Sequence, residues 1–264
     1  MSVWRSASDR LARMIGLTVA HSQERYYQAL LRNIQPGQRW LDVGCGRQIV
    51  PDFAASLDEQ RAAAAKAKLL VGMDVDPAIR DHPLLQQRVV GWGDALPFAD
   101  SSFDLITANM VMEHVKDPTR VLSEVRRVLR PGGRFLFHTP NSKYYLIFIA
   151  SLIPDFVKLK IVRLLESRPK EDVFHAYYRI NTSSRVRTLA AQSGFEVKHI
   201  DVGGSVGSFA ALGPIGVLEV FILKALSWPL LQDFNVTLIA VLIKPDHVDL
   251  TSQNGFEFAR HHVP

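Results

Sequence analysis

At 264 residues, 47% of them hydrophobic and 22% charged, the chain can form one large globular domain with a substantial core, or two small ones. Cys45 is the only cysteine, which excludes an internal disulfide framework and favours a reducing compartment. The formal net charge of +5 permits contact with nucleic acid or anionic lipid without requiring either.

Residues 1–36 are predicted to form a helical cap, because apolar residues recur there at helical spacing. These residues are Leu11, Met14, Ile15, Tyr26, Tyr27, Leu30, Leu31 and Ile34. A Pro-Gly pair ends the segment. The apolar patch at residues 14–20 is short and contains Gly16 and Thr18, so it lacks the pattern of a signal peptide.

The next segment, residues 39–48, reads RWLDVGCGRQ. Its apolar run stops at Gly44, as in a buried parallel strand that ends in a glycine turn. Gly44 and Gly46 have no Cβ, so a ligand can approach the backbone closely. A helix is expected to start after Gly46, and its N–H groups would favour a carboxylate or phosphate. Cys45 is expected to be a small packed residue, since no spacing pairs it with a base.

Two common nucleotide-binding motifs are excluded at this turn. The dinucleotide fingerprint, Gly-x-Gly-x-x-Gly, would need its third glycine at Ile49, which is bulky and β-branched. A P-loop would need Gly-Lys-Ser/Thr, and no such run follows Gly46. A dehydrogenase is therefore disfavoured.

Further apolar segments alternate with helical ones along the chain. Strands are predicted at residues 69–74, 89–93, 103–108, 134–138, 195–202 and 236–243, and helices at residues 59–68, 118–129 and 181–193. This alternation predicts a parallel sheet with ligands at the carboxyl ends of its strands. Residues 143–170 are apolar and basic, and residues 212–231 are apolar. Residues 202–218 are uncharged but rich in glycine and shorter than the roughly 20 residues of a membrane span.

Polar side chains end the predicted strands. Asp74 ends the second strand, where its carboxylate could accept two hydrogen bonds from a ribose diol. The alternative, a helix cap, suits Asp76 better because Pro77 follows it. Asp94 and Asn109 follow the third and fourth strands. An isolated Asp after a strand is usually a turn residue, so the surrounding pattern has to decide its role.

That pattern resembles the class I S-adenosylmethionine-dependent methyltransferases, of the methyltransferase type 11-like group. The matching segments, in the order typical of the family, are residues 41–46, 91–104, 109–115 and 131–141. The match to the first motif departs at its last glycine, where this chain has Gln48. The resemblance covers about residues 39–141, and more weakly the last two strands.

The resemblance implies an α/β fold: a Rossmann-like, doubly wound, mostly parallel seven-stranded sheet with an apolar helical insertion after strand five. The domain would span residues 37–250, with residues 143–180 as a substrate or lid insertion and residues 251–264 as a tail. S-adenosylmethionine would be the cofactor. The residues implied to bind it are Asp42, Gly44, Cys45, Gly46, Asp74, Val75, Asp94, Ala95, Leu96 and Asn109. In the family the N-terminal segment lies over the cofactor, yet Tyr26 and Tyr27 are expected to pack in the core.

Two histidines are candidate general bases for a hydroxyl acceptor. His114 belongs to the Glu-His-Val run after the fourth strand, where a purely structural role is the alternative. His175 lies in the polar-aromatic run FHAYYR of residues 174–179, which suits either substrate contact or interface packing. Some ubiquinone-pathway O-methyltransferases carry a metal-linked glutamate where this chain has Met110, so no metal is expected.

The expected reaction is methyl transfer to a small-molecule or lipid-linked acceptor, with oxygen favoured over carbon or nitrogen. The rival of another class is a module that binds the cofactor or a membrane surface without catalysis. Nucleic acid is not expected as a partner, because the chain has no Asn-Pro-Pro-aromatic run and no dense basic tract. We expect a cytoplasmic monomer or homodimer, with peripheral membrane contact left open by the basic, apolar segments.

Overall fold

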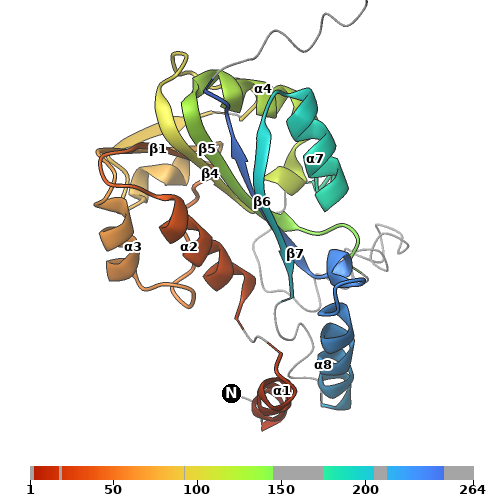
Figure 1. Ribbon diagram of the computed structural model, residues 1–264. Helices are drawn as coiled ribbons and strands as arrows, with labels where there is room; N and C mark the ends of the chain where they lie inside the picture. The colour runs from red at the N-terminus through yellow and green to blue at the C-terminus, as the bar shows by residue number, and fades with distance from the viewer. Residues whose placement is uncertain (1–2, 18–19, 92, 145–174, 205–212, 247–264) are drawn as a thin grey trace, which may run out of the picture.

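The computed structural model describes residues 3–17, 20–91, 93–144, 175–204 and 213–246 (Figure 1). These residues form a seven-stranded sheet in the order β3-β2-β1-β4-β5-β7-β6. The strands are β1 (Arg39–Val43), β2 (Leu69–Asp74), β3 (Gln87–Val90), β4 (Phe103–Asn109), β5 (Leu129–Pro140), β6 (Glu196–Gly203) and β7 (Thr237–Ile243). Strand β7 runs antiparallel to both of its neighbours, and the other described pairs are parallel. The predicted Rossmann-like sheet is confirmed.

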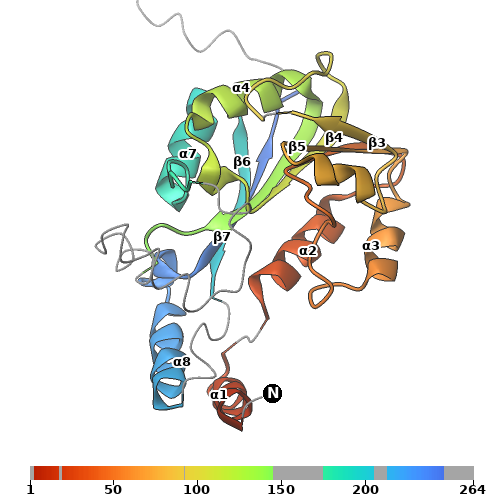
Figure 2. The same cartoon turned by 180° about the vertical axis from the view of Figure 1, so that it is seen from behind.

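Helices cover both faces of this sheet (Figures 1 and 2). They are α2 (Ser22–Asn33), α3 (Leu57–Ala64) and the 3₁₀ helix η1 (Pro77–Asp81) on one face, and α4 (Pro118–Val128) and α7 (Ser183–Gln192) on the other. In β1, Trp40 packs in the core beside α2 and α3, whereas Leu41 and Val43 pack in the core beside α4 and α7. Burial on both faces explains why the neighbouring residues Trp40 and Leu41, which face opposite sides of the sheet, are both apolar.

The N-terminal segment contains two helices instead of one continuous cap. The first, α1 (Val3–Met14), ends near Gly16, whose φ of +68° a glycine adopts without strain. The second, α2, starts at a capping box in which His21 and Glu24 bond each other's backbone. Tyr26, fully buried, packs against the sheet from α2 as expected, whereas α1 packs against α8 (Pro214–Leu226), away from the sheet (Figure 1).

The prediction that a helix starts directly after Gly46 is wrong. Residues 47–56 form turns, and α3 begins only at Leu57. The side chain of Gln60 holds these turns, because its Oε1 accepts the N–H groups of Ile49 and Val50 at 3.1 and 3.2 Å. These two N–H groups therefore stabilise the turns and are not the first N–H groups of a helix.

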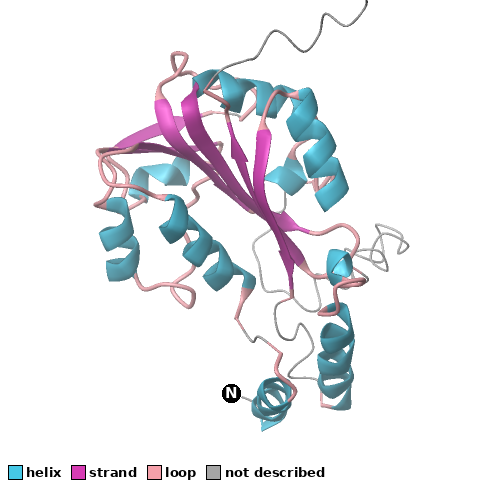
Figure 3. Cartoon of the chain, viewed as in Figure 1, coloured by secondary structure: helices cyan, strands magenta, loops and turns pink. Residues whose placement is uncertain are grey.

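The carboxyl ends of β1, β2, β4 and β5 meet at one edge of the sheet, where loops and the short helices η2 (Met112–His114) and η4 (Gln232–Phe234) gather (Figure 3). The proposed insertion at residues 143–180 and the tail at residues 251–264 fall largely or wholly outside the described residues. Among the helices described, none is both long and apolar enough to cross a membrane.

Candidate functional site

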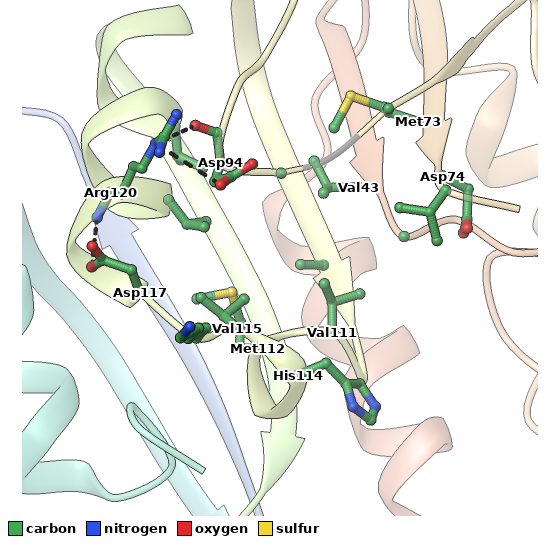
Figure 4. Close-up of a pocket in the computed structure, with 18 of the residues that line it drawn as sticks. Val43, Met73, Asp74, Asp94, Val111, Met112, His114, Val115, Asp117 and Arg120 are labelled. Carbon is green, nitrogen blue, oxygen red and sulfur yellow. Dashed lines mark hydrogen bonds and ion pairs between the residues drawn. The ribbon is translucent and has the colours of Figure 1, made fainter. Parts of the chain in front are cut away.

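Two cavities open at the carboxyl edge of the sheet. The larger, of about 860 Å³, extends from the ends of β2 and β3 to η2 (Figure 4). The smaller, of about 220 Å³, lies between the glycine turn and α2. Gly44 and Met110 line both cavities. These two residues therefore lie at the boundary where the two cavities meet.

The glycine turn brings bare backbone to this boundary. Gly44 has a φ of +64°, and a Cβ there would overlap the Cγ2 methyl group of Val111. Its N–H donates to the carbonyl of Met73 at 2.7 Å. Gly46 has a φ of +54°, and its N–H donates to Oδ2 of Asp74 at 2.8 Å. Position 44 thus requires glycine on both steric and conformational grounds.

Asp74 ends β2 and lines the larger cavity (Figure 4). Besides the bond from Gly46, its Oδ1 accepts the N–H of Asp76 at 2.9 Å. A carboxylate has about four lone-pair positions, so two more hydrogen bonds can be accepted from the cavity. Asp76 in turn caps η1 by accepting the N–H of Ala78 at 2.8 Å. The division of roles predicted for the two aspartates fits this geometry.

Asp42 lines the smaller cavity and is 2% exposed. Burial raises its pKa to about 7; the hydrogen bond from Thr107 opposes this shift and the nearby carboxylate of Asp74 adds to it. The hydroxyl of Thr107 donates to Asp42 at 2.5 Å and accepts the indole N–H of Trp40 at 2.7 Å. A buried carboxylate at a cavity wall is suited to a cationic group, which would stabilise its ionised form.

Asn109 lines the smaller cavity from the end of β4. Its Nδ2 donates to Oε1 of Gln23 at 2.7 Å, and its Oδ1 lies 2.9 Å from Nδ1 of His138. Burial lowers the pKa of His138 to about 3, so the ring is neutral and donates from Nδ1. Gln23 also lines this cavity, and nothing in the sequence pattern marks it, because a glutamine on a helix is usually a surface residue.

Cys45 lines the smaller cavity and is 4% exposed. Burial, followed by the carboxylates of Asp42 and Asp74, raises the pKa of its thiol, which keeps it protonated. This agrees with a packed residue and not a nucleophile. Within the described ranges, no group of three or more His, Cys, Asp or Glu side chains could hold a metal ion; the absence of a metal stays a prediction.

Residues 94–96, which follow the third strand predicted from the sequence, contribute unevenly to the walls of the cavities. Asp94 lines the larger cavity and its carbonyl accepts Nε of Arg120 at 3.1 Å (Figure 4). Ala95 and Leu96 line neither cavity. The N–H of Leu96 donates to Glu124 at 2.9 Å, and its side chain is buried in the core. The predicted binding of the cofactor by Ala95 and Leu96 therefore stays a prediction, and their positions do not support it. Val75, also predicted, lines the larger cavity.

His114 lines the larger cavity on η2 (Figure 4). Its Nδ1 lies 3.1 Å from the carbonyl oxygen of His175, and its Nε2 lies 4.0 Å from Oε1 of Glu113. Glu113 is 4% exposed, and burial raises its pKa. Its Oε2 accepts the hydroxyl of Thr139 at 2.9 Å. Thr139 at the end of β5 thus holds Glu113, and the carbonyl of His175 holds His114.

His175 contributes its carbonyl, but its ring lines neither cavity. The ring packs edge-on against Tyr177, with centroids 4.5 Å apart, and it is Tyr177 that lines the larger cavity. The sequence run around these residues suits either substrate contact or interface packing, and its spacing alone does not tell which side chain faces inward. Met110 was also missed; its φ of +58°, uncommon for a side chain of this size, is of the kind that clusters at functional sites.

The described residues fit S-adenosylmethionine as a bound cofactor. Asp74 offers two accepting positions suited to a ribose diol, and Asp42 offers a carboxylate suited to the ammonium group. At Gly46 no atom lies within 4 Å of the position that a Cβ would take, so a ligand that reaches both carboxylates can approach the backbone there.

Comparison with known proteins places the chain in a family. A model of the methyltransferase domain family matches residues 18–200. The demethylmenaquinone methyltransferase of Mycolicibacterium paratuberculosis is 31% identical over 184 residues, which cover 65% of this chain and 75% of that protein. The protein of the same name from Mycobacterium tuberculosis is 30% identical over 178 residues, 62% of this chain and 71% of that protein.

Solved structures agree at the level of the fold. An S-adenosylmethionine-dependent methyltransferase from Methanosarcina mazei superposes with a TM-score of 0.54 at 20% identity, covering 83% of this chain and 98% of that one. One from Mesorhizobium loti gives a TM-score of 0.52 at 20% identity, covering 82% and 94%. With the family match over residues 18–200, the chain belongs to the methyltransferase domain family, as a class I S-adenosylmethionine-dependent methyltransferase.

Proposed function

We propose that the chain methylates a ring hydroxyl of a small or lipid-linked apolar acceptor, with His114 as the general base. The observation that supports this most strongly is the position of His114 in the larger cavity, among apolar side chains. Val111, Met112 and Val115 line the cavity beside it, and Tyr177 adds an aromatic wall. Apolar walls with a few polar groups are typical of sites for small molecules.

The protein's part in the reaction is to orient the acceptor and remove its proton. Bound S-adenosylmethionine supplies a methyl group already activated by the sulfonium, so positioning contributes much of the rate. A proton on Nδ1 of His114 would donate to the carbonyl of His175, which makes Nε2 the basic nitrogen. Nε2 would take the proton of the acceptor hydroxyl, and an ionised Glu113, 4.0 Å from it, would stabilise the resulting imidazolium.

Transfer to a ring carbon is the second candidate, because the similar proteins cited above are named for demethylmenaquinone, a quinone. Removing a proton from a ring hydroxyl makes both the oxygen and the adjacent ring carbons nucleophilic. The same base would therefore serve both outcomes, and the methylated atom of the product distinguishes them.

The test uses the full chain with S-adenosylmethionine labelled in the methyl group. The acceptors are an alkylated phenol, a reduced prenylated naphthoquinone and an apolar primary amine. We expect label in the phenol or the quinol, and NMR of the product identifies the methylated atom. His114→Gln should lower turnover roughly 10²- to 10⁴-fold, the usual contribution of a general base.

The matched control is His199→Gln, because His199 is an exposed histidine on β6 that lines neither cavity. Full activity in His114→Gln across the pH range, or labelling of the amine alone, would contradict the proposal. Cofactor binding without transfer to any acceptor would favour a non-catalytic module instead.

A further inference from the structure

A second feature of the molecule lies outside the two cavities: an apolar surface made by α8 and the residues that follow it. Seven large apolar side chains are exposed there, and we call them the α8 surface. They are Ile215, Leu218, Phe221, Trp228, Leu230, Leu231 and Phe234. Leu218 is 61% exposed, Trp228 63% and Leu230 92%. Single exposed apolar residues are common, but seven within 20 positions are a patch that indicates contact with another apolar phase.

Helix α8 is apolar on its outward side as well as on its buried side, where Val220 and Leu223 are 1% and 2% exposed. Its outward side has Ile215, Leu218 and Phe221, spaced three residues apart on one stripe. Its inward side includes Glu219, which is 2% exposed, beside Val220. Helix α1 packs against α8 (Figures 1 and 2), and the side chains of the apolar stripe are more than half exposed. A surface helix in water normally buries its apolar side.

The length of α8 suits a helix that lies on a membrane. Its 13 residues extend about 20 Å at 1.5 Å per residue, well below the roughly 30 Å of a bilayer core. Trp228 and Phe234 add aromatic rings beyond its end, of the kind enriched at the boundary between lipid and water.

Basic residues border the α8 surface. Arg10 and Arg13 are exposed on α1, which packs against α8. Lys224 lies on α8 itself, with its Nζ 3.9 Å from the position that a Cβ of Gly16 would occupy. These cations would meet the headgroups of an anionic bilayer while the apolar stripe entered its acyl boundary.

The acidic residues of this region do not oppose such a contact. In residues 213–235 they are Glu219, which is buried, and Asp233, which pairs with Lys143 at 3.5 Å. On α1, Asp9 is partly buried and has two exposed arginines as neighbours along the helix. The exposed charge around the apolar stripe is therefore mainly positive, which favours anionic lipid over a neutral surface.

The α8 surface is attached to the same edge of the sheet as the cavities. Nδ2 of Asn141, just after β5, donates to the carbonyls of Asp233 and Asn235 at 2.8 and 2.7 Å. Two residues earlier, Thr139 donates to Glu113, beside His114. The end of β5 thus links the α8 surface to the wall of the larger cavity (Figures 1 and 3).

We propose that the α8 surface docks the enzyme on an anionic lipid bilayer, with α8 lying in the plane of the headgroups. Docking would bring the larger cavity to the surface that holds a lipid-linked acceptor; this consequence, unlike the docking itself, rests on the proposed function.

The test is co-sedimentation of the full chain with vesicles, without cofactor or acceptor, so that it does not depend on methyl transfer. The vesicles are phosphatidylcholine alone, or phosphatidylcholine mixed with phosphatidylglycerol. We expect binding to the anionic vesicles that weakens with added salt. Leu218→Glu/Leu230→Glu should lower the partition coefficient by on the order of tenfold or more, since two apolar side chains would leave the lipid.

The matched control is Phe53→Glu/Leu57→Glu, which places the same two charges on exposed apolar positions near α3, away from α8. It should bind vesicles as the wild type does. Circular dichroism checks that each variant is folded. No binding of the folded wild type to either vesicle, or equal binding by both double variants, would overturn the proposal. So would a dimer, seen by light scattering, that Leu218→Glu/Leu230→Glu dissociates while vesicle binding is unchanged.

Discussion

The carboxylate of Asp74 accepts the backbone N–H of Gly46 at 2.8 Å, across 28 positions of sequence. This bond joins the end of β2 to the glycine turn after β1. Because the same carboxylate lines the larger cavity, the residue that positions the turn is also the one that we propose as the acceptor for a ribose. The shape of the turn and the affinity for the cofactor are therefore expected to change together.

Asp74→Ala should weaken binding of S-adenosylmethionine by roughly ten- to a hundredfold, the value of one or two hydrogen bonds to a charged group. Calorimetric titration measures the change. Asp76→Ala is the control, because it removes a carboxylate that caps η1 and lines neither cavity. Equal losses in the two variants would show that the ribose role of Asp74 is wrong.

Cofactor affinity should depend on pH through Asp42, whose pKa is raised to about 7. The cofactor's ammonium favours the carboxylate form, so below pH 7 binding has to displace a proton. Affinity should therefore fall with decreasing pH, by at most about tenfold per unit. Asp42→Asn should weaken binding at pH 7.5 and flatten this dependence. A wild-type affinity that does not change between about pH 5.5 and 7 would be inconsistent with Asp42 as the partner of the ammonium.

The same shift predicts how stability changes with pH. A raised pKa means that the folded state holds the proton more tightly than the unfolded state. The stabilisation is fully present below the unfolded pKa of 3.8 and is lost as the pH rises toward about 7.

Relative to Asp42→Asn, the wild type should lose about 4 kcal/mol between those limits, at about 1.4 kcal/mol per pH unit. Urea unfolding at several pH values measures the difference. A gap between the two proteins that stays constant with pH would show that folding does not raise the pKa of Asp42.

Gly44→Ala should destabilise the protein more than Gly37→Ala does. Both glycines have positive φ, so each substitution costs about 1–2 kcal/mol for the left-handed conformation. Only at Gly44 would the new Cβ overlap Val111, which adds about 1–3 kcal/mol; at Gly37 no atom lies within 4 Å. Gly44→Ala with Val111→Ala should recover part of the loss. Equal destabilisation at the two glycines would exclude the steric contribution.

The fold could be predicted from the sequence where a single pattern determined each element. The apolar run of β1 and the amphipathic spacing of α4 report burial directly, and the sheet follows from the alternation of such segments. The turn after Gly46 could not be predicted. Its conformation depends on Gln60, a residue that reaches back from α3 to bond two N–H groups, and no local pattern encodes that contact.

The residues of the candidate site likewise fall into those that the sequence pattern predicts and those that it does not. Asp42 lies near the end of β1, Gly44 follows that strand and Asp74 ends β2, and the parallel sheet brings these strand ends together. Tyr177 and His175 lie in a loop, where the backbone decides which side chain points into the cavity. Gln23 reaches the smaller cavity from α2, so its role depends on how that helix packs on the sheet.

Calorimetric titration of the wild-type protein with S-adenosylmethionine tests the central claim most directly, with its demethylated product as competitor. The account predicts binding at one site per chain, displaced by the product. A protein that is folded by circular dichroism and releases no heat with either compound would contradict the assignment of the cofactor site to the region between Asp42 and Asp74, where the two cavities meet.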